Sequence, residues 1–147
     1  MSNIVIDTNV LLSGMLWRGP AYKALQIATD SYQLVQNDLT LKEFVKVINR
    51  PKFKKILNRR QYTPDMLINA LFRQASFYEI KPSVCEKVLR IAIEDKDDLK
   101  FIELAKVSNS RIIVTGDKHL LELKNVDKIR IISVSEFIAM HNNIGPS

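Results

Sequence analysis

The stretch Ile4-Val5-Ile6-Asp7-Thr8-Asn9 decides the fold. Its three consecutive β-branched residues are typical of a buried strand in a parallel sheet, where both faces of the strand are covered. This strand stops at a polar cluster that begins with Asp7. The pattern returns late in the chain, where a predicted strand at 111–115 is followed by Gly116 and Asp117. We therefore expect both aspartates at the carboxyl edge of a sheet, where open α/β sheets bind their ligands.

Strands and helices alternate along the rest of the chain. Pro51 is expected to end or restart a helix, and 83–93 fits neither helical nor strand periodicity. Asp38 or Thr40 is available as the N-cap of one helix, whereas Thr63-Pro64 and Ser133 to Glu136 are helix-start patterns. The further predicted strands are 32–35, 77–80 and 129–132, and the predicted helices are 10–12, 21–28, 41–49, 64–75, one from Asp98, one through Leu121 and one after Ser133. This alternation predicts one α/β domain with a mostly parallel sheet of about five strands over residues 1–141, followed by a tail at 142–147.

Length and composition exclude several classes of protein. A chain of 147 residues fits one domain, and 46% apolar with 26% charged residues argues against disorder. No apolar run approaches the roughly 18 residues that span a bilayer, and the N-terminus lacks the features of a signal peptide. Cys85 is the single cysteine, which excludes an intrachain disulfide and a cysteine-based zinc or iron–sulfur site. We expect a soluble cytoplasmic protein that does not bind membranes.

The positive charge is concentrated in one segment. The formal net charge is +6, from 22 Lys and Arg against 16 Asp and Glu. Six cations and no acid lie between positions 50 and 60, namely Arg50, Lys52, Lys54, Lys55, Arg59 and Arg60. Without them the basic count equals the acidic count. This segment is a candidate contact for a nucleic-acid backbone, since surface cations supply the sequence-independent part of such binding.

The acids carry the chemistry. Glu43 lies in the helix after the second predicted strand, and the run Glu94-Asp95-Lys96-Asp97-Asp98 places four acids at a helix start. An aspartate after a strand is often only a turn former or N-cap, and acids at a helix start often only face solvent. Together with Asp7 and Asp117, however, these groups can meet at one end of the sheet. Crowded carboxylates need a compensating cation, and Mg²⁺ at such a site supports phosphodiester hydrolysis.

Four motifs in order resemble the PIN domain family. They are Ile-Val-Ile-Asp7-Thr8-Asn9-Val-Leu-Leu-Ser, Leu41-Lys42-Glu43-Phe44, Asp95-Lys96-Asp97-Asp98 with the Leu-Lys-Phe-Ile-Glu-Leu-Ala that follows, and Ile-Val-Thr115-Gly116-Asp117-Lys-His-Leu-Leu. The resemblance covers nearly the full chain. It is strongest to the prokaryotic PIN toxins of toxin–antitoxin pairs, the VapC-like ribonucleases.

The resemblance implies a three-layer α/β/α fold and an endoribonuclease that depends on one or two Mg²⁺ or Mn²⁺ ions. The residues that match the catalytic, metal-binding acids of the family are Asp7, Glu43, Asp98 and Asp117, with Asp95 or Asp97 as substitutes for Asp98. Asn9 and Thr115 match polar residues that orient these acids or a water.

The resemblance also implies partners. We expect an RNA substrate and a cognate antitoxin, so the 50–60 segment has three interpretations: an RNA contact, an antitoxin surface or a solvated face. A homodimer is possible, with Met15, Leu16 and Trp17 as its interface. Two other functions stay open: a PIN nuclease of RNA processing or DNA flap cleavage without an antitoxin, and a catalytically silent module that binds nucleic acid or protein.

Overall fold

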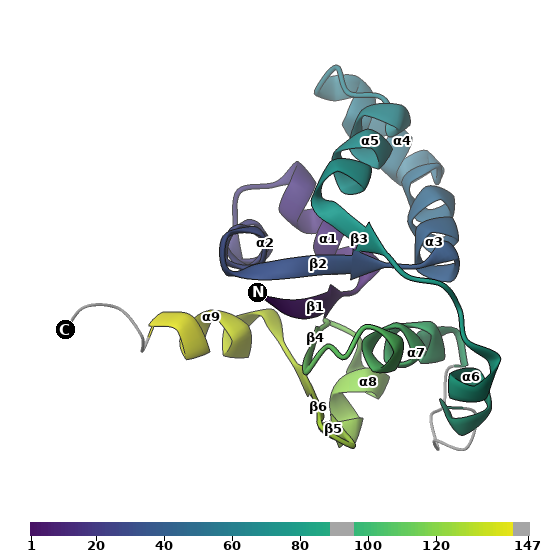
Figure 1. Cartoon of the computed structure of the whole chain (residues 1–147). Helices are drawn as coiled ribbons and strands as arrows, with labels where there is room; N and C mark the ends of the chain where they lie inside the picture. The colour runs from purple at the N-terminus through teal and green to yellow at the C-terminus, as the bar shows by residue number, and fades with distance from the viewer. Residues whose placement is uncertain (89–95, 143–147) are drawn as a thin grey trace.

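A six-stranded sheet forms the centre of the computed structural model, which describes residues 1–88 and 96–142 (Figure 1). Its strands are β1 (Ser2–Ile6), β2 (Tyr32–Gln36), β3 (Ala75–Phe77), β4 (Ile112–Val114), β5 (Asn125–Val126) and β6 (Ile129–Ile132). The order across the sheet is β3-β2-β1-β4-β6-β5, and all neighbours are parallel except β5 and β6. The prediction of an α/β fold with a mostly parallel sheet is confirmed.

Helices connect and cover the strands. In the described ranges they are α1 (Thr8–Leu16), α2 (Pro20–Ser31), α3 (Asp38–Ile48), α4 (Pro51–Arg59), α5 (Pro64–Gln74), α6 (Pro82–Val88), α7 (Leu99–Val107), α8 (Lys118–Leu123) and α9 (Val134–Asn142), with a short 3₁₀ turn, η1 (Lys96–Asp98), before α7. None of the described helices is both long enough and apolar enough to cross a bilayer.

The buried side chains of β1 divide between two cores. Ile4 and Ile6 pack into one core with side chains from α1, α2, α3, α5 and α9, whereas Val5 packs into the other with side chains from α7 and α8. All three residues are fully buried. Successive residues of a strand point to opposite faces, so an unbroken apolar run is what a strand covered on both sides requires. The expected three-layer α/β/α arrangement is therefore present.

The strand order reverses direction at β1 and β4. The chain moves outward from β1 through β2 to β3, then crosses back to β4 on the other side of β1. The pairs Val5 with Ile113 and Ile6 with Val114 set the register. Asp7 extends this ladder, since its backbone N–H donates to the carbonyl of Val114 at 3.0 Å. Ligands of open α/β sheets bind at such a reversal of strand order, beyond the carboxyl ends of the strands.

Helix starts follow the predicted chemistry with one correction. The Oγ1 of Thr63 accepts from the N–H of Met66 at 3.3 Å, and the hydroxyl of Ser133 accepts from the N–H of Glu136 at 3.2 Å. The predicted N-cap of α3, Asp38 or Thr40, is wrong. Asn37 is the N-cap, and Thr40 is the third residue of the helix, whose hydroxyl accepts from the Asn37 N–H at 2.9 Å.

Four elements differ from the predictions or complete them. The third strand begins at Ala75 rather than residue 77, because α5 already ends at Gln74 and the chain pairs at once with β2. β5 was not predicted, since its two residues are too few to show alternation. Pro51 restarts a helix, α4, and part of the undecided 83–93 stretch belongs to α6. The positions 89–93 of that stretch lie outside the described residues.

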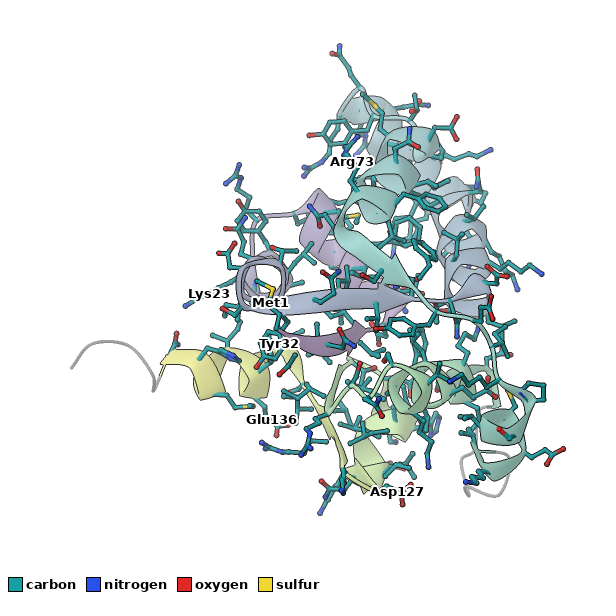
Figure 2. The ribbon with its side chains drawn as sticks, viewed as in Figure 1. Met1, Lys23, Tyr32, Arg73, Asp127 and Glu136 are labelled. Carbon is teal, nitrogen blue, oxygen red and sulfur yellow. The ribbon has the colours of Figure 1, made fainter. Side chains whose placement is uncertain are left out.

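The C-terminal helix packs back onto the start of β2. The hydroxyl of Tyr32, which is labelled in Figure 2, lies 2.9 Å from Nε2 of His141. Most of the predicted tail, from 143 onward, lies outside the described residues.

Near the other end of the chain, Leu16 is buried in the core and so does not belong to a surface interface, whereas Trp17 is 40% exposed.

Candidate active site at the carboxyl edge of the sheet

A cleft of about 100 Å³ lies where β1 and β4 end. Its lining residues are Asp7, Thr8, Asn9, Glu43, Val47, Arg50, Asp98, Phe101 and Asp117. Among them are all four acids that the sequence nominates, delivered by α1, α3, the turn before α7 and the start of α8. Segments more than 100 residues apart in the chain thus meet at one acidic cleft.

A larger hollow, of about 350 Å³, lies among α1, α2 and α5. Its lining is mainly apolar, with Met15, Leu25 and Met66 among its side chains, and it includes no carboxylate. Chemistry on a phosphodiester needs charged or metal-binding groups, which this hollow lacks. The smaller acidic cleft is therefore the candidate active site.

Asp7 is the most confined of the four acids. It is 6% exposed, and its Oδ1 accepts from the N–H of Val10 at 2.9 Å, which caps α1. Its Oδ2 accepts from the Thr115 hydroxyl and from the N–H of Gly116. Burial raises the pKa of Asp7, these hydrogen bonds lower it, and the neighbouring Glu43 carboxylate raises it; the net shift is upward. A cation in the cleft would offset this penalty on the charged form.

Asp117 combines capping with a place on the cleft. Its Oδ1 accepts from the backbone N–H groups of His119 at 2.7 Å and Leu120 at 3.2 Å, so it caps α8. Its own N–H donates to Oγ1 of Thr115 at 2.9 Å. Thr115 is fully buried and therefore joins the two aspartates through one hydroxyl. The capping role and the place on the cleft are compatible, because capping uses one carboxylate oxygen of each aspartate.

Glu43 is held from two sides. Lys100 of α7 donates to its Oε1 at 3.0 Å, and the hydroxyl of Thr8 donates to its Oε2 at 2.5 Å. These contacts tie α3 to α1 and α7 across the cleft. Neither partner was predicted. Thr8 stands between Asp7 and Asn9, and this position could have indicated a role at the site. No sequence pattern distinguishes Lys100 from other helix-surface lysines.

The third acid was the open choice, and the structure separates two of the three candidates. Asp98 is 9% exposed, directly precedes α7 and lines the cleft. Asp97 is exposed and lines a neighbouring hollow instead. Asp95 lies outside the described residues. Asn9 is exposed on the cleft, beside Asp7 in sequence.

The basic segment divides into one cleft residue and a helix. Arg50 lines the cleft, whereas Lys52, Lys54, Lys55 and Arg59 are exposed along α4 and Arg60 follows it. In Figure 1, α4 lies beyond the end of α3 that is farther from α7. Of the six cations, Arg50 is therefore the one that the structure places at the acids.

A sequence model of the PIN domain matches residues 3–119. The chain belongs to the PIN domain family. The match spans all four cleft acids, so the resemblance found in the motifs is confirmed. A comparison of the sequence with curated proteins gives no match.

Solved structures support the same fold. This PIN domain is similar to VapBC2 from Rickettsia felis bound to a promoter DNA fragment, with a TM-score of 0.64, 11% identity and coverage of 89% of this chain and 98% of that chain. For PAE2754 from Pyrobaculum aerophilum the TM-score is 0.57, with 17% identity and coverage of 95% and 88%. For the sarcin-ricin loop cleaving toxin VapC20 from Mycobacterium tuberculosis it is 0.57, with 12% identity and coverage of 86% and 98%. At sequence identities this low, the structural similarity shows a shared fold and nothing more.

The donor chemistry of this PIN domain fits a hard divalent cation. Four carboxylates line one cleft, and two of them, Asp7 and Glu43, are close enough for one to raise the pKa of the other. Within residues 1–88 and 96–142, however, no three His, Cys, Asp or Glu side chains are already arranged to hold one ion. The Glu43 carboxylate is engaged with Thr8 and Lys100. The ligand types in the cleft therefore fit a hard divalent cation that keeps several of its waters.

Proposed function

We propose that this PIN domain is a metal-dependent endoribonuclease that hydrolyses RNA phosphodiester bonds and acts as the toxin of a toxin–antitoxin pair. The convergence of Asp7, Glu43, Asp98 and Asp117 on one cleft carries the proposal. These acids come from four segments of the chain. Their negative charges repel one another, and a bound cation would offset this repulsion.

Asp7, Asp98 and Asp117, with Glu43, would hold Mg²⁺ or Mn²⁺. When bound, one or two such ions activate a water and stabilise charge on the attacking and leaving oxygens. The protein contributes orientation: Thr115 fixes the Asp7 carboxylate, and the start of α8 fixes Asp117. Arg50, on the rim of the same cleft, offers a positive group to a phosphate oxygen. Asn9 is placed to hydrogen-bond a water or a ribose hydroxyl.

The structural neighbours support the choice of RNA and of an antitoxin. One is described as a sarcin-ricin loop cleaving toxin, and two others were solved as VapBC complexes. We propose that this chain likewise cuts RNA in the cytoplasm and is held inactive by a cognate protein. A homodimer that uses the exposed Trp17 is part of the same proposal.

The direct test is cleavage by purified protein. Labelled RNA should be cut with Mg²⁺ or Mn²⁺ and left intact with EDTA. Asp7→Asn and Asp117→Asn should each reduce kcat/KM at least a hundredfold, because each removes a charged ligand. Equal cleavage by the parent and both variants would refute the metal-site assignment. Flap DNA substrates run in parallel test the alternative role in DNA cleavage.

One observation favours a different function. The Lys100 ammonium already neutralises Glu43, as expected of a silent module in which a protein cation replaces the metal. Calorimetry with Mn²⁺ separates the two functions. Heat of binding at or below millimolar Mn²⁺ that is lost in Asp7→Asn supports the nuclease; no binding supports the silent module.

The antitoxin has its own test. A small open reading frame that neighbours or overlaps this gene should encode a protein that co-purifies with the chain and suppresses cleavage. If no such frame exists and the protein still cuts RNA, the role in RNA processing without an antitoxin replaces the toxin assignment.

A further inference from the structure

A second hollow, of about 260 Å³, adjoins the acidic cleft. It is lined by Leu39, Lys42, Glu43, Lys46, Arg50, Asp97 and Lys100. Glu43 and Arg50 line both hollows, so the two are adjacent. The cleft holds four acids and one cation among its lining residues, whereas the second hollow holds four cations and two acids. A change in the sign of the local charge therefore occurs across a short distance on this surface.

Two of the four cations of the second hollow have no ion-pair partner among the described residues. Lys42 and Lys46 are four residues apart on α3, so they share one face of the helix. Both are exposed, and neither forms an ion pair with any residue in the described part of the chain. Lys100 faces them from α7, although its ammonium also contacts Glu43. Like charges at this spacing repel, and a bound anion would relieve the repulsion.

We propose that Lys42, Lys46, Arg50 and Lys100 form a phosphate subsite that binds the backbone of single-stranded RNA beside the phosphodiester placed at the carboxylates. This inference rests on the proposed function. A strand that presents one phosphate to the acidic cleft must place its next phosphates nearby, where the cleft acids would repel them. The adjoining basic hollow gives these phosphates a favourable position. Leu39, 37% exposed on the same hollow, offers an apolar surface to a ribose or base.

The subsite differs from the contact that the sequence suggested. The 50–60 segment was predicted as a nucleic-acid contact because of its dense positive charge. Its cations after Arg50, however, lie along α4, which leads away from the cleft. Lys42 and Lys46 are separated in sequence by one acid and two apolar residues, so no run of charge reveals them. An acidic peptide is a second possible occupant of a basic hollow. Adjacency to the cleft favours RNA, because a divalent cation at the carboxylates would hold one phosphate of the same strand, whereas an acidic peptide would bring only further negative charge to them.

The test is RNA binding, measured in EDTA so that cleavage does not contribute. A fluorescent single-stranded RNA oligonucleotide is titrated with the parent and with Lys42→Ala/Lys46→Ala at several salt concentrations. Two lost phosphate contacts should weaken binding roughly tenfold at low salt and reduce the salt slope of log K by about 1.4, or about 0.7 per contact on a single strand. Lys42→Arg/Lys46→Arg should bind like the parent.

Lys23→Ala/Lys128→Ala is the matched control, because it also removes two exposed lysines. Figure 2 labels Lys23 on α2 and Asp127, the neighbour of Lys128, at the β5–β6 turn; both lie away from α3. This control should keep the affinity and the salt slope of the parent. Circular dichroism should show the same fold for all variants, since every substituted side chain is exposed.

Two results would overturn the subsite. One is an unchanged affinity and slope in Lys42→Ala/Lys46→Ala. The other is a poly-glutamate peptide that binds the parent more tightly than RNA does and loses that binding in the same variant, which would make the hollow a protein-docking surface. A parent that binds RNA through these lysines but cuts none with Mn²⁺ would contradict the proposed function and leave the subsite supported.

Discussion

The hydroxyl of Thr115 donates a hydrogen bond to the buried carboxylate of Asp7. The two residues stand at the ends of β4 and β1, one step beyond the last paired residues, Val114 and Ile6. The parallel register of two adjacent strands therefore sets this contact. Because Thr115 also accepts from the N–H of Asp117, the sheet itself positions both aspartates of the cleft.

Thr115→Val tests this link. Valine has a similar shape but neither donates to Asp7 nor accepts from Asp117, so two polar groups at the cleft lose a partner. We expect the free energy of unfolding to fall by about 1–3 kcal/mol, the cost of leaving such groups unpaired. Urea denaturation in EDTA measures it. Thr115→Ser keeps the hydroxyl and serves as the control, with a smaller loss expected; a Thr115→Val protein as stable as the parent would show that the two hydrogen bonds do not contribute to stability.

Asp7→Asn should change the pH dependence of stability. Burial raises the pKa of Asp7 in the folded protein above its unfolded value of about 3.9. The contribution of Asp7 to stability is therefore fully present below that value and is lost as pH rises through the folded pKa. Asparagine does not titrate, and its side-chain oxygen still accepts from Val10. The variant should thus gain stability relative to the parent between pH 4 and pH 7, measured by urea unfolding without metal. A constant difference over this range would contradict the shift.

Lys100→Met should free Glu43 from its cation. Both side chains are about one-fifth exposed, so the ion pair contributes at most about 1 kcal/mol to folding. Mn²⁺ should bind several-fold more tightly to the variant, because the ion no longer competes with the ammonium for Glu43. Calorimetry gives the affinity. A double-mutant cycle with Glu43→Gln isolates the pair, and the gain should vanish in that background. Unchanged affinity in Lys100→Met would show that Glu43 does not contact the ion.

Gly14→Ala should destabilise the packing of α1 against α2. A Cβ at this position would lie 2.9 Å from the backbone oxygen of Ala21 and 3.1 Å from side-chain carbons of Leu25. We expect a loss of about 1–3 kcal/mol from overpacking, despite the higher helix propensity of alanine. Gly116→Ala is the control, since no atom lies within 4 Å of its added Cβ and its backbone is not in the left-handed region. Its thermal unfolding midpoint should stay close to that of the parent; a matching drop there would point to a general effect of the substitution.

Local pattern was sufficient for the central strands and for most helix starts. Three consecutive β-branched residues predict β1, and the Thr63-Pro64 pair predicts the start of α5. The short elements could not be predicted from the sequence, for a physical reason. A strand of two residues, such as β5, is stabilised by its pairing with β6 rather than by its own sequence. The N-cap of α3 was misassigned because neighbouring polar residues can all cap, and only the backbone conformation selects Asn37.

The candidate site was predictable in its acids and not in their partners. Asp7 and Asp117 follow apolar strands, which is a local signal. In the sequence, Lys100 and Lys42 resemble other helix-surface lysines. Only the structure shows that Lys100 contacts Glu43 and that Lys42 lines the hollow beside the cleft. The dense positive charge at 50–60 belongs mostly to α4. Of its six cations only Arg50, which precedes this helix, lines the cleft.

The sequence by itself indicated the fold class through buried strands that alternate with helices, and its four ordered motifs indicated the family and the four acids that line the cleft. The tertiary structure decided which groups act on one another. It brought Thr115 to Asp7 and Lys100 to Glu43, and it placed the basic face of α3 beside the acidic cleft. Electrostatic interactions depend on distance and burial, and residues far apart in the chain acquire both only when the sheet aligns β1 with β4 and α7 packs against it.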